Sequence, residues 1–90
     1  MSEEIQPLGQ VTHYFDRISV AVIRLWDTLT LGDWVHFYGN KTNFVQQVQS
    51  MQINHQPVDA AYAEDEVAVL VEDRVRKGDW VYPYQPENYE

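Results

Sequence analysis

The sequence contains no cysteine, and this excludes two classes of site. Neither a disulfide framework nor a thiolate metal site can form, and a chain without disulfides suits a reducing cytoplasm. The first residues, 1–5, are acidic and lack the basic start and apolar run of a signal peptide. A membrane-spanning helix needs about 18 consecutive apolar residues, and no stretch of this sequence approaches that length. We therefore expect a cytoplasmic protein without a membrane partner.

Basic residues are also scarce, because six Lys and Arg stand against fourteen Asp and Glu, for a net charge of −8. Nucleic acids are held mainly by Lys and Arg side chains that replace condensed counterions, so the charge argues against direct nucleic-acid binding. The single basic cluster is Arg74, Arg76 and Lys77, beside a Gly-Asp turn. It is interpreted first as a solvated turn, with contact to an acidic patch or a few phosphates as the alternative.

The motifs that catalysis and nucleotide binding need are missing. None of the glycines stands in a phosphate-binding loop, and none of the serines stands in a Gly-x-Ser-x-Gly elbow. His13, His36 and His55 lie far apart, without the close pair that indicates zinc. We expect no catalytic residue, cofactor, metal or nucleotide, so the chain is predicted not to be an enzyme.

What the sequence does contain is short strands separated by turn signals, which predicts an all-β barrel or sandwich. At 90 residues the chain is expected to form a single domain, with a lead over 1–7 and a flexible tail over 83–90. The run Val20–Leu25 is apolar on nearly both faces and is predicted to be central. A loop is expected over 27–33, and one helical turn over 57–63. The predicted strands are 9–15, 20–25, 34–38, 43–55, 67–71 and 80–82.

The segment 43–55 allows two interpretations. Phe44 and Val48 point one way in a strand and Met51 and Ile53 the other, so a bulge near Gln49 would place both pairs inside. The spacing of Phe44, Val48 and Met51 also fits a helix. The flanking strands favour the bulged strand.

Aromatic residues are frequent, at 13%. In so small a domain most of them are expected in the core, while Trp26, Tyr84 and Tyr89 are expected to be exposed and to favour a protein partner. Gly-Asp-Trp-Val occurs twice, at 32–35 and 78–81, and predicts two turns of one type in which glycine takes a positive φ.

Several segments together resemble the second, β-barrel domain of translation elongation factor Tu over about residues 8–82. They are GQVTHYF at 9–15, VAV at 20–22, LTLGDWV at 29–35, VQSMQ at 48–52 and AEDEVA at 63–68. The chain is also similar to stand-alone translation elongation factor-like proteins, and similar barrels end collagenase-like peptidase family proteins. The resemblance implies a small closed β-barrel of about six strands.

The resemblance further implies a docking role near translation, because in the factors this barrel packs on the GTPase domain and helps to hold the acceptor end of aminoacyl-tRNA. Both glycines of the family's stretch are replaced here, by Glu64 and Ala68, which predicts an altered turn, and Ser50 stands where the factors commonly carry Glu. The carboxylates of 64–66 are interpreted as a solvated loop or a docking contact. The candidate partner-binding residues are Ser50, Met51, Glu64, Asp65, Glu66, Arg74, Arg76 and Lys77.

The function expected from the sequence is that of a non-catalytic docking module that contacts a protein or ribonucleoprotein partner. The alternative is an accessory subunit of a peptidase-like or RNA-modifying enzyme.

Overall fold

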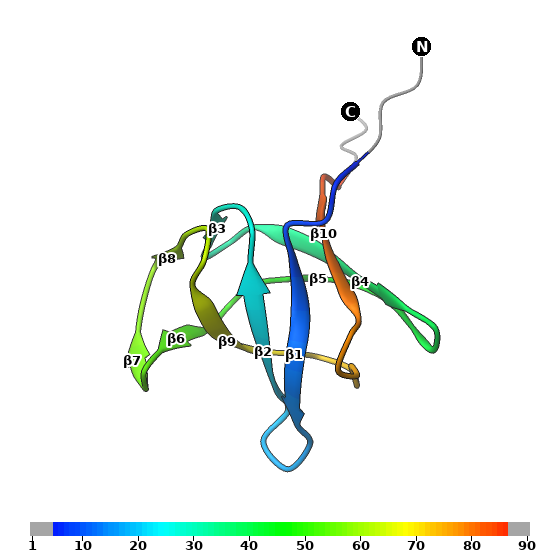
Figure 1. Cartoon of the computed structure of the whole chain (residues 1–90), viewed down its shortest axis with the longest axis horizontal. Coiled ribbons are helices and arrows are strands. Elements are labelled where there is room, and N and C mark those ends of the chain that lie inside the picture. Colours follow the sequence, from blue (N-terminus) through cyan, green and yellow to red (C-terminus); the bar gives the residue numbers. More distant parts are fainter. Residues whose placement is uncertain (1–4, 87–90) are drawn as a thin grey trace.

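The computed structural model describes residues 5–86, and this part of the chain contains strands but no helix (Figure 1). The prediction of an all-β domain is confirmed. Within these residues no helix is present that has the length and apolar character to cross a membrane. The strands are β1 Gly9–Phe15, β2 Val20–Leu25, β3 Leu29–Thr30, β4 Trp34–Gly39, β5 Thr42–Gln47, β6 Met51–Ile53, β7 Gln56–Pro57, β8 Ala60–Ala61, β9 Glu66–Leu70 and β10 Trp80–Tyr84.

Eight of these strands form one curled antiparallel sheet in the order β5-β4-β10-β1-β2-β9-β6-β7, and β3 pairs with β8 in a second small sheet (Figure 1). β2 lies between β1 and β9, so its predicted central place is confirmed. The predicted closed barrel is not confirmed, because the large sheet is open and has β5 and β7 at its edges.

The break between β5 and β6 explains why the sheet stays open. The backbone of Val48 leaves the ladder and bonds to a loop instead: its N–H donates to Asp33 O, and its carbonyl accepts from Gly32 N, both at 2.8 Å. β5 therefore pairs with β4, while β6 pairs with β9 at the other side of the sheet. The strand interpretation of 43–55 is confirmed against the helix, with a break in place of the bulge. Phe44, Val48, Met51 and Ile53 all pack in or on the core.

One side chain bridges the seam that the open sheet leaves. Gln46 on β5 is only 2% exposed. Its Nε2 donates to Leu70 O at 3.0 Å, and its Oε1 accepts from Glu72 N at 2.8 Å. A side-chain amide thus provides one donor and one acceptor where a closed barrel would have backbone ladder bonds.

The core is aliphatic, so the prediction that most aromatic residues lie inside is wrong. Among the described residues Phe37 is the buried aromatic side chain, whereas Trp34, Tyr38 and Trp80 are 37 to 48% exposed. The reason is that successive side chains on a strand point to opposite faces. Valine and other aliphatic residues occupy the inward positions, so the aromatic residues next to them point outward. The fully buried large residues are Phe37, Ile23, Leu25, Leu29, Met51, Val11, Val35, Val48, Val67, Val69, Val75 and Val81.

The structure differs from the sequence predictions at two connecting segments. The expected loop at 27–33 contains β3, and the expected helical turn at 57–63 is wrong, because β7 and β8 occupy that region. Leu29 and Ala61 pair directly and are both fully buried, so a tertiary contact stabilises extended backbone there. β10 also runs two residues past its predicted end, to Tyr84. Residues 1–4 and 87–90, with Tyr89, lie outside the described part, and the single domain over 1–90 stays a prediction.

Both Gly-Asp pairs form turns of one type, as predicted. Gly32 and Gly78 have φ of +93° and +96°, which non-glycine residues rarely adopt. In each turn the following Asp accepts a hydrogen bond from the amide three residues earlier, at 2.9 Å for Asp33 and 2.8 Å for Asp79. The repeated sequence therefore specifies a repeated local structure.

A third turn has the same geometry with Glu64 in the glycine position. Asp65 accepts from Tyr62 N at 2.9 Å, and Glu64 has φ of +79°. The altered turn that was predicted at Glu64 is therefore not found: the backbone stays left-handed, which costs about 1 kcal/mol in an L-residue. Glu64 also forms an exposed ion pair with Arg24 at 3.0 Å, which is worth at most about 1 kcal/mol.

Replacing Glu64 with glycine is expected to raise the free energy of unfolding by about 0.5 kcal/mol, since relief of the left-handed strain outweighs the lost ion pair. The reverse exchange, Gly78→Ala, is expected to lower it by about 1 kcal/mol. Urea denaturation of both variants tests this. A Glu64→Gly protein less stable than the parent would contradict this balance and show that the ion pair outweighs the left-handed strain.

Candidate functional site

Strand alternation places six ring-bearing side chains on the outer face of the sheet. Val35 and Phe37 point inward on β4, and Val81 points inward on β10, so the residues between them point outward. The antiparallel register then sets the outward residues of the two strands opposite one another. These cross-strand pairs are Tyr38 with Trp80, His36 with Tyr82 and Trp34 with Tyr84, and we call them the aromatic platform.

His36 lies between two other rings of the platform, and four of the six platform side chains are exposed: Trp34, Tyr38, Trp80 and Tyr84. His36 lies 5.7 Å from Tyr38 and 6.4 Å from Tyr82 between ring centroids. His36 Nε2 lies 2.6 Å from Asn43 Oδ1, which fixes the orientation of the imidazole ring. Trp26 lies at the margin, 6.0 Å from Trp80. Contiguous exposed aromatic rings are typical of surfaces that bind another molecule.

A shallow apolar groove of about 350 Å³ crosses the platform. Its walls are four platform residues together with Ile5 and Pro83. Five of its six lining residues lie on the paired strands β4 and β10, and Ile5 comes from the segment before β1, so most of the groove is formed before any partner binds.

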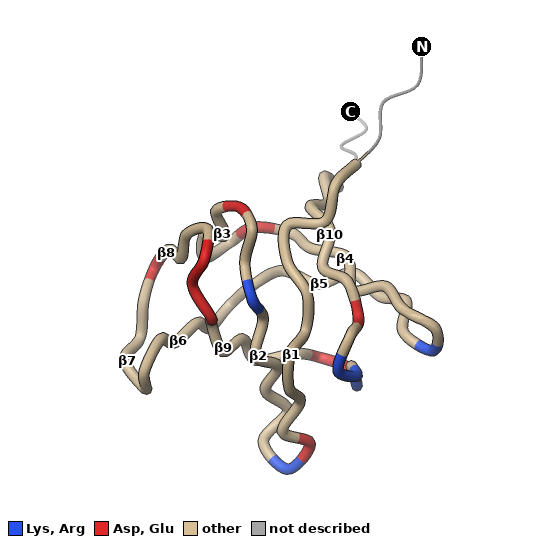
Figure 2. The backbone as a smooth tube through the Cα atoms, viewed as in Figure 1, with Lys and Arg blue, Asp and Glu red and all other residues tan. Residues whose placement is uncertain are grey.

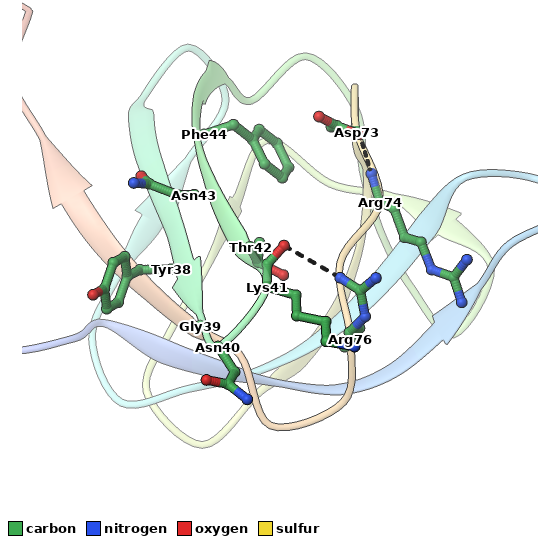
Figure 3. A pocket seen from close by; sticks show the side chains of 10 residues that line it. All are labelled: Tyr38, Gly39, Asn40, Lys41, Thr42, Asn43, Phe44, Asp73, Arg74 and Arg76. Carbon is green, nitrogen blue, oxygen red and sulfur yellow. Dashed lines mark hydrogen bonds between the residues drawn. The ribbon is translucent and has the colours of Figure 1, made fainter.

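A polar pocket of about 520 Å³ adjoins the platform where the β4–β5 hairpin meets the segment that leads into β10 (Figure 3). Tyr38 lines both this pocket and the groove, so the two surfaces are continuous. We call it the basic pocket, and its lining residues are Tyr38, Gly39, Asn40, Lys41, Thr42, Asn43, Phe44, Asp73, Arg74 and Arg76.

Of the basic residues predicted from the sequence, Arg74 and Arg76 line this pocket. Lys77 is exposed on the same segment but does not line it. Lys41 completes the pocket and was missed, because it is remote in sequence and only the pairing of β4 with β10 brings its hairpin close.

The other predicted site residues lie elsewhere. Ser50 lines a separate apolar groove that includes Phe15 and Leu70, and Met51 is 2% exposed in the core. The carboxylates of 64–66 lie at the start of β9, which β1 and β2 separate from β10. Within residues 5–86 no three His, Asp or Glu side chains are grouped so that they would hold a metal ion.

No protein-family model matches the chain. A curated relative, an uncharacterized protease of Methanocaldococcus jannaschii, is 41% identical over 76 residues. The alignment covers 83% of this chain but 19% of the protease. The chain thus corresponds to about a fifth of that longer protein.

The fold matches the C-terminal domain of a Geobacillus thermoleovorans protein assigned to the U32 peptidases, with a TM-score of 0.84 and 20% identity over 89% of this chain and 93% of that domain. A second structure, the selenomethionine variant of the same domain, has a TM-score of 0.81 and 21% identity over 86% and 98%. At this identity the likeness establishes a common fold.

These comparisons support the peptidase part of the sequence resemblance and do not confirm its elongation factor Tu part. The expected link to translation and protein biosynthesis is wrong, because the matches are to U32 peptidase-family domains and a protease. The segments that carry the resemblance hold the Gly-Asp turn at Gly32 and the core residues Val11, Ala21 and Val67. Such residues specify a small curled sheet and not the partner that it binds.

Proposed function

We propose that the chain is a non-catalytic accessory domain that docks through the aromatic platform on a U32 peptidase-family protein in the cytoplasm. The platform is the observation that carries this proposal. The comparisons support it, since the fold is that of a terminal domain of such a protein and the sequence matches part of a protease.

The chemistry of the platform favours a protein partner. Trp and Tyr rings offer large, rigid contact areas with little side-chain entropy to lose, and they are the residues that most often dominate binding energy at interfaces. The net charge of −8 opposes a polyanion over most of the surface. The partner is therefore expected to offer apolar and polar side chains that fill the groove.

A non-catalytic role agrees with the use of the buried polar groups. The buried polar side chains of the described residues are Thr42, Gln46 and Asp79, and hydrogen bonds within the fold use all three. Thr42 lines the basic pocket, but its hydroxyl donates its proton to Asp79 and so is engaged within the fold.

The proposal is tested by affinity purification of the tagged chain from native extract, with mass spectrometry of what is retained. The unmodified chain is expected to retain a U32 peptidase-family protein. A Trp34→Thr, Tyr84→Thr variant is expected to retain about tenfold less, because one cross-strand pair of exposed rings is removed from the platform.

A Phe15→Thr, Leu70→Thr variant is the matched control, since it removes two similarly exposed side chains from the separate apolar groove. It is expected to retain as much as the unmodified chain. Equal retention by the platform variant and the unmodified chain would overturn the assignment of the docking surface, and absence of any U32 protein from all samples would overturn the proposed function.

A further inference from the structure

Four of the six basic residues of this acidic chain lie on two segments that meet at the basic pocket, the β4–β5 hairpin and the segment that leads into β10 (Figure 2). Lys41 is on the β4–β5 hairpin, and Arg74, Arg76 and Lys77 are on the segment between β9 and β10. Three of the four line the basic pocket, with Asp73 as the acidic residue among the lining side chains. The pocket therefore has a local positive charge on a domain that is otherwise negative.

The walls of the pocket are joined by one buried carboxylate. Asp79 Oδ2 accepts from Thr42 Oγ1 at 2.5 Å on one wall and from Arg76 N at 2.8 Å on the other. Gly39 packs so closely against this carboxyl group that a Cβ there would overlap it. The two walls are thus held at a fixed separation before any ligand arrives, which lowers the entropy lost on binding.

The cationic groups within the pocket keep most of their binding capacity. Arg76 Nη1 donates to Lys41 O at 3.4 Å, a long contact that leaves the other guanidinium donors available (Figure 3). Within residues 5–86 no hydrogen bond or ion pair uses the Arg74 guanidinium or the Lys41 ammonium group. Guanidinium groups match carboxylates in a bidentate manner.

We propose that the basic pocket binds the carboxylate side chains of an acidic peptide segment. A nucleic acid gains affinity from many phosphate contacts along its length, and beyond this pocket it would meet a surface of like charge. An acidic segment needs only the few cations that the pocket groups together. Tyr38 and the Phe44 ring supply apolar contact for the stems of such side chains.

Although Tyr38 lines both this pocket and the platform groove, the proposal does not depend on the docking of a U32 peptidase-family protein and is tested without that protein. The full chain is titrated against a short labelled peptide rich in glutamate, its glutamine counterpart, and a single-stranded oligonucleotide of equal charge. Fluorescence anisotropy is measured at about 50 mM and about 150 mM salt.

The glutamate peptide is expected to bind, more weakly at the higher salt, and the glutamine peptide is expected not to bind. Arg74→Gln is expected to weaken binding about fivefold to tenfold. Arg17→Gln, the same charge change on the exposed β1–β2 hairpin, is expected to leave binding unchanged. The proposal is overturned if the oligonucleotide binds more tightly than the glutamate peptide, if both Arg variants weaken binding equally, or if no glutamate peptide binds.

Discussion

Replacing Asp79 with alanine is expected to lower the free energy of unfolding by about 3 kcal/mol. The carboxylate is 6% exposed and accepts hydrogen bonds from the Thr42 hydroxyl and the Arg76 amide. Hydrogen bonds to charged groups contribute about 1.5 to 3 kcal/mol each, and Thr42, itself buried, would lose its partner. Urea denaturation of both proteins measures the difference.

Asp33 provides the matched control, because it occupies the same position in the equivalent Gly-Asp turn but is exposed. Asp33→Ala is expected to cost about 1 kcal/mol, the usual worth of one exposed capping bond. Equal losses in the two variants would mean that the link between Thr42 and the 76–79 turn adds nothing. The preorganisation of the basic pocket would then lack its structural basis.

Replacing Gln46 with leucine is expected to lower the free energy of unfolding by about 2 to 3 kcal/mol. Leucine has a similar volume, so packing changes little, but Leu70 O and Glu72 N would each lose a hydrogen bond at the seam of the sheet. Both bonds are part-buried, and each contributes about 1 to 1.5 kcal/mol. Thermal or urea unfolding of the variant tests whether this side chain holds the curled sheet together.

The neighbouring Gln47 is the control, because its Nε2 bonds to Gly32 O at 3.1 Å in an exposed position. Gln47→Leu is expected to cost less than about 1 kcal/mol, since water can replace the lost bond. A stable Gln46→Leu protein would show that β5 is held by its pairing with β4 alone.

The longer strands could be predicted from the sequence because their signals are local. Alternation and β-branched residues mark 9–15, 20–25 and 34–38, and the structure has strands at these places. The two-residue strands β3 and β8 could not be predicted this way, since each is extended only because the buried Leu29 and Ala61 meet across the chain. That the sheet stays open could not be predicted from local sequence either. It depends on the hydrogen bonds that the backbone of Val48 makes with the distant loop residues Gly32 and Asp33.

The candidate site was only partly predictable for the same reason. Composition shows that aromatic residues are frequent but not which way they point. Their outward direction follows from the burial of Val35, Phe37 and Val81, which alternate with them along the strands. Arg74 and Arg76 stood out as a cluster in the sequence. Lys41 did not, because its proximity depends on tertiary contacts.

The central claim, that the aromatic platform docks on a U32 peptidase-family protein, is tested most directly by an NMR titration. The labelled chain is titrated with such a protein, prepared without any domain of this fold. The account predicts that the indole signals of Trp34 and Trp80 shift or broaden while the methyl signals of Ile18 and Leu70, in the separate apolar groove, stay in place. Changes confined to Ile18 and Leu70, or no change at any of these residues, would contradict it.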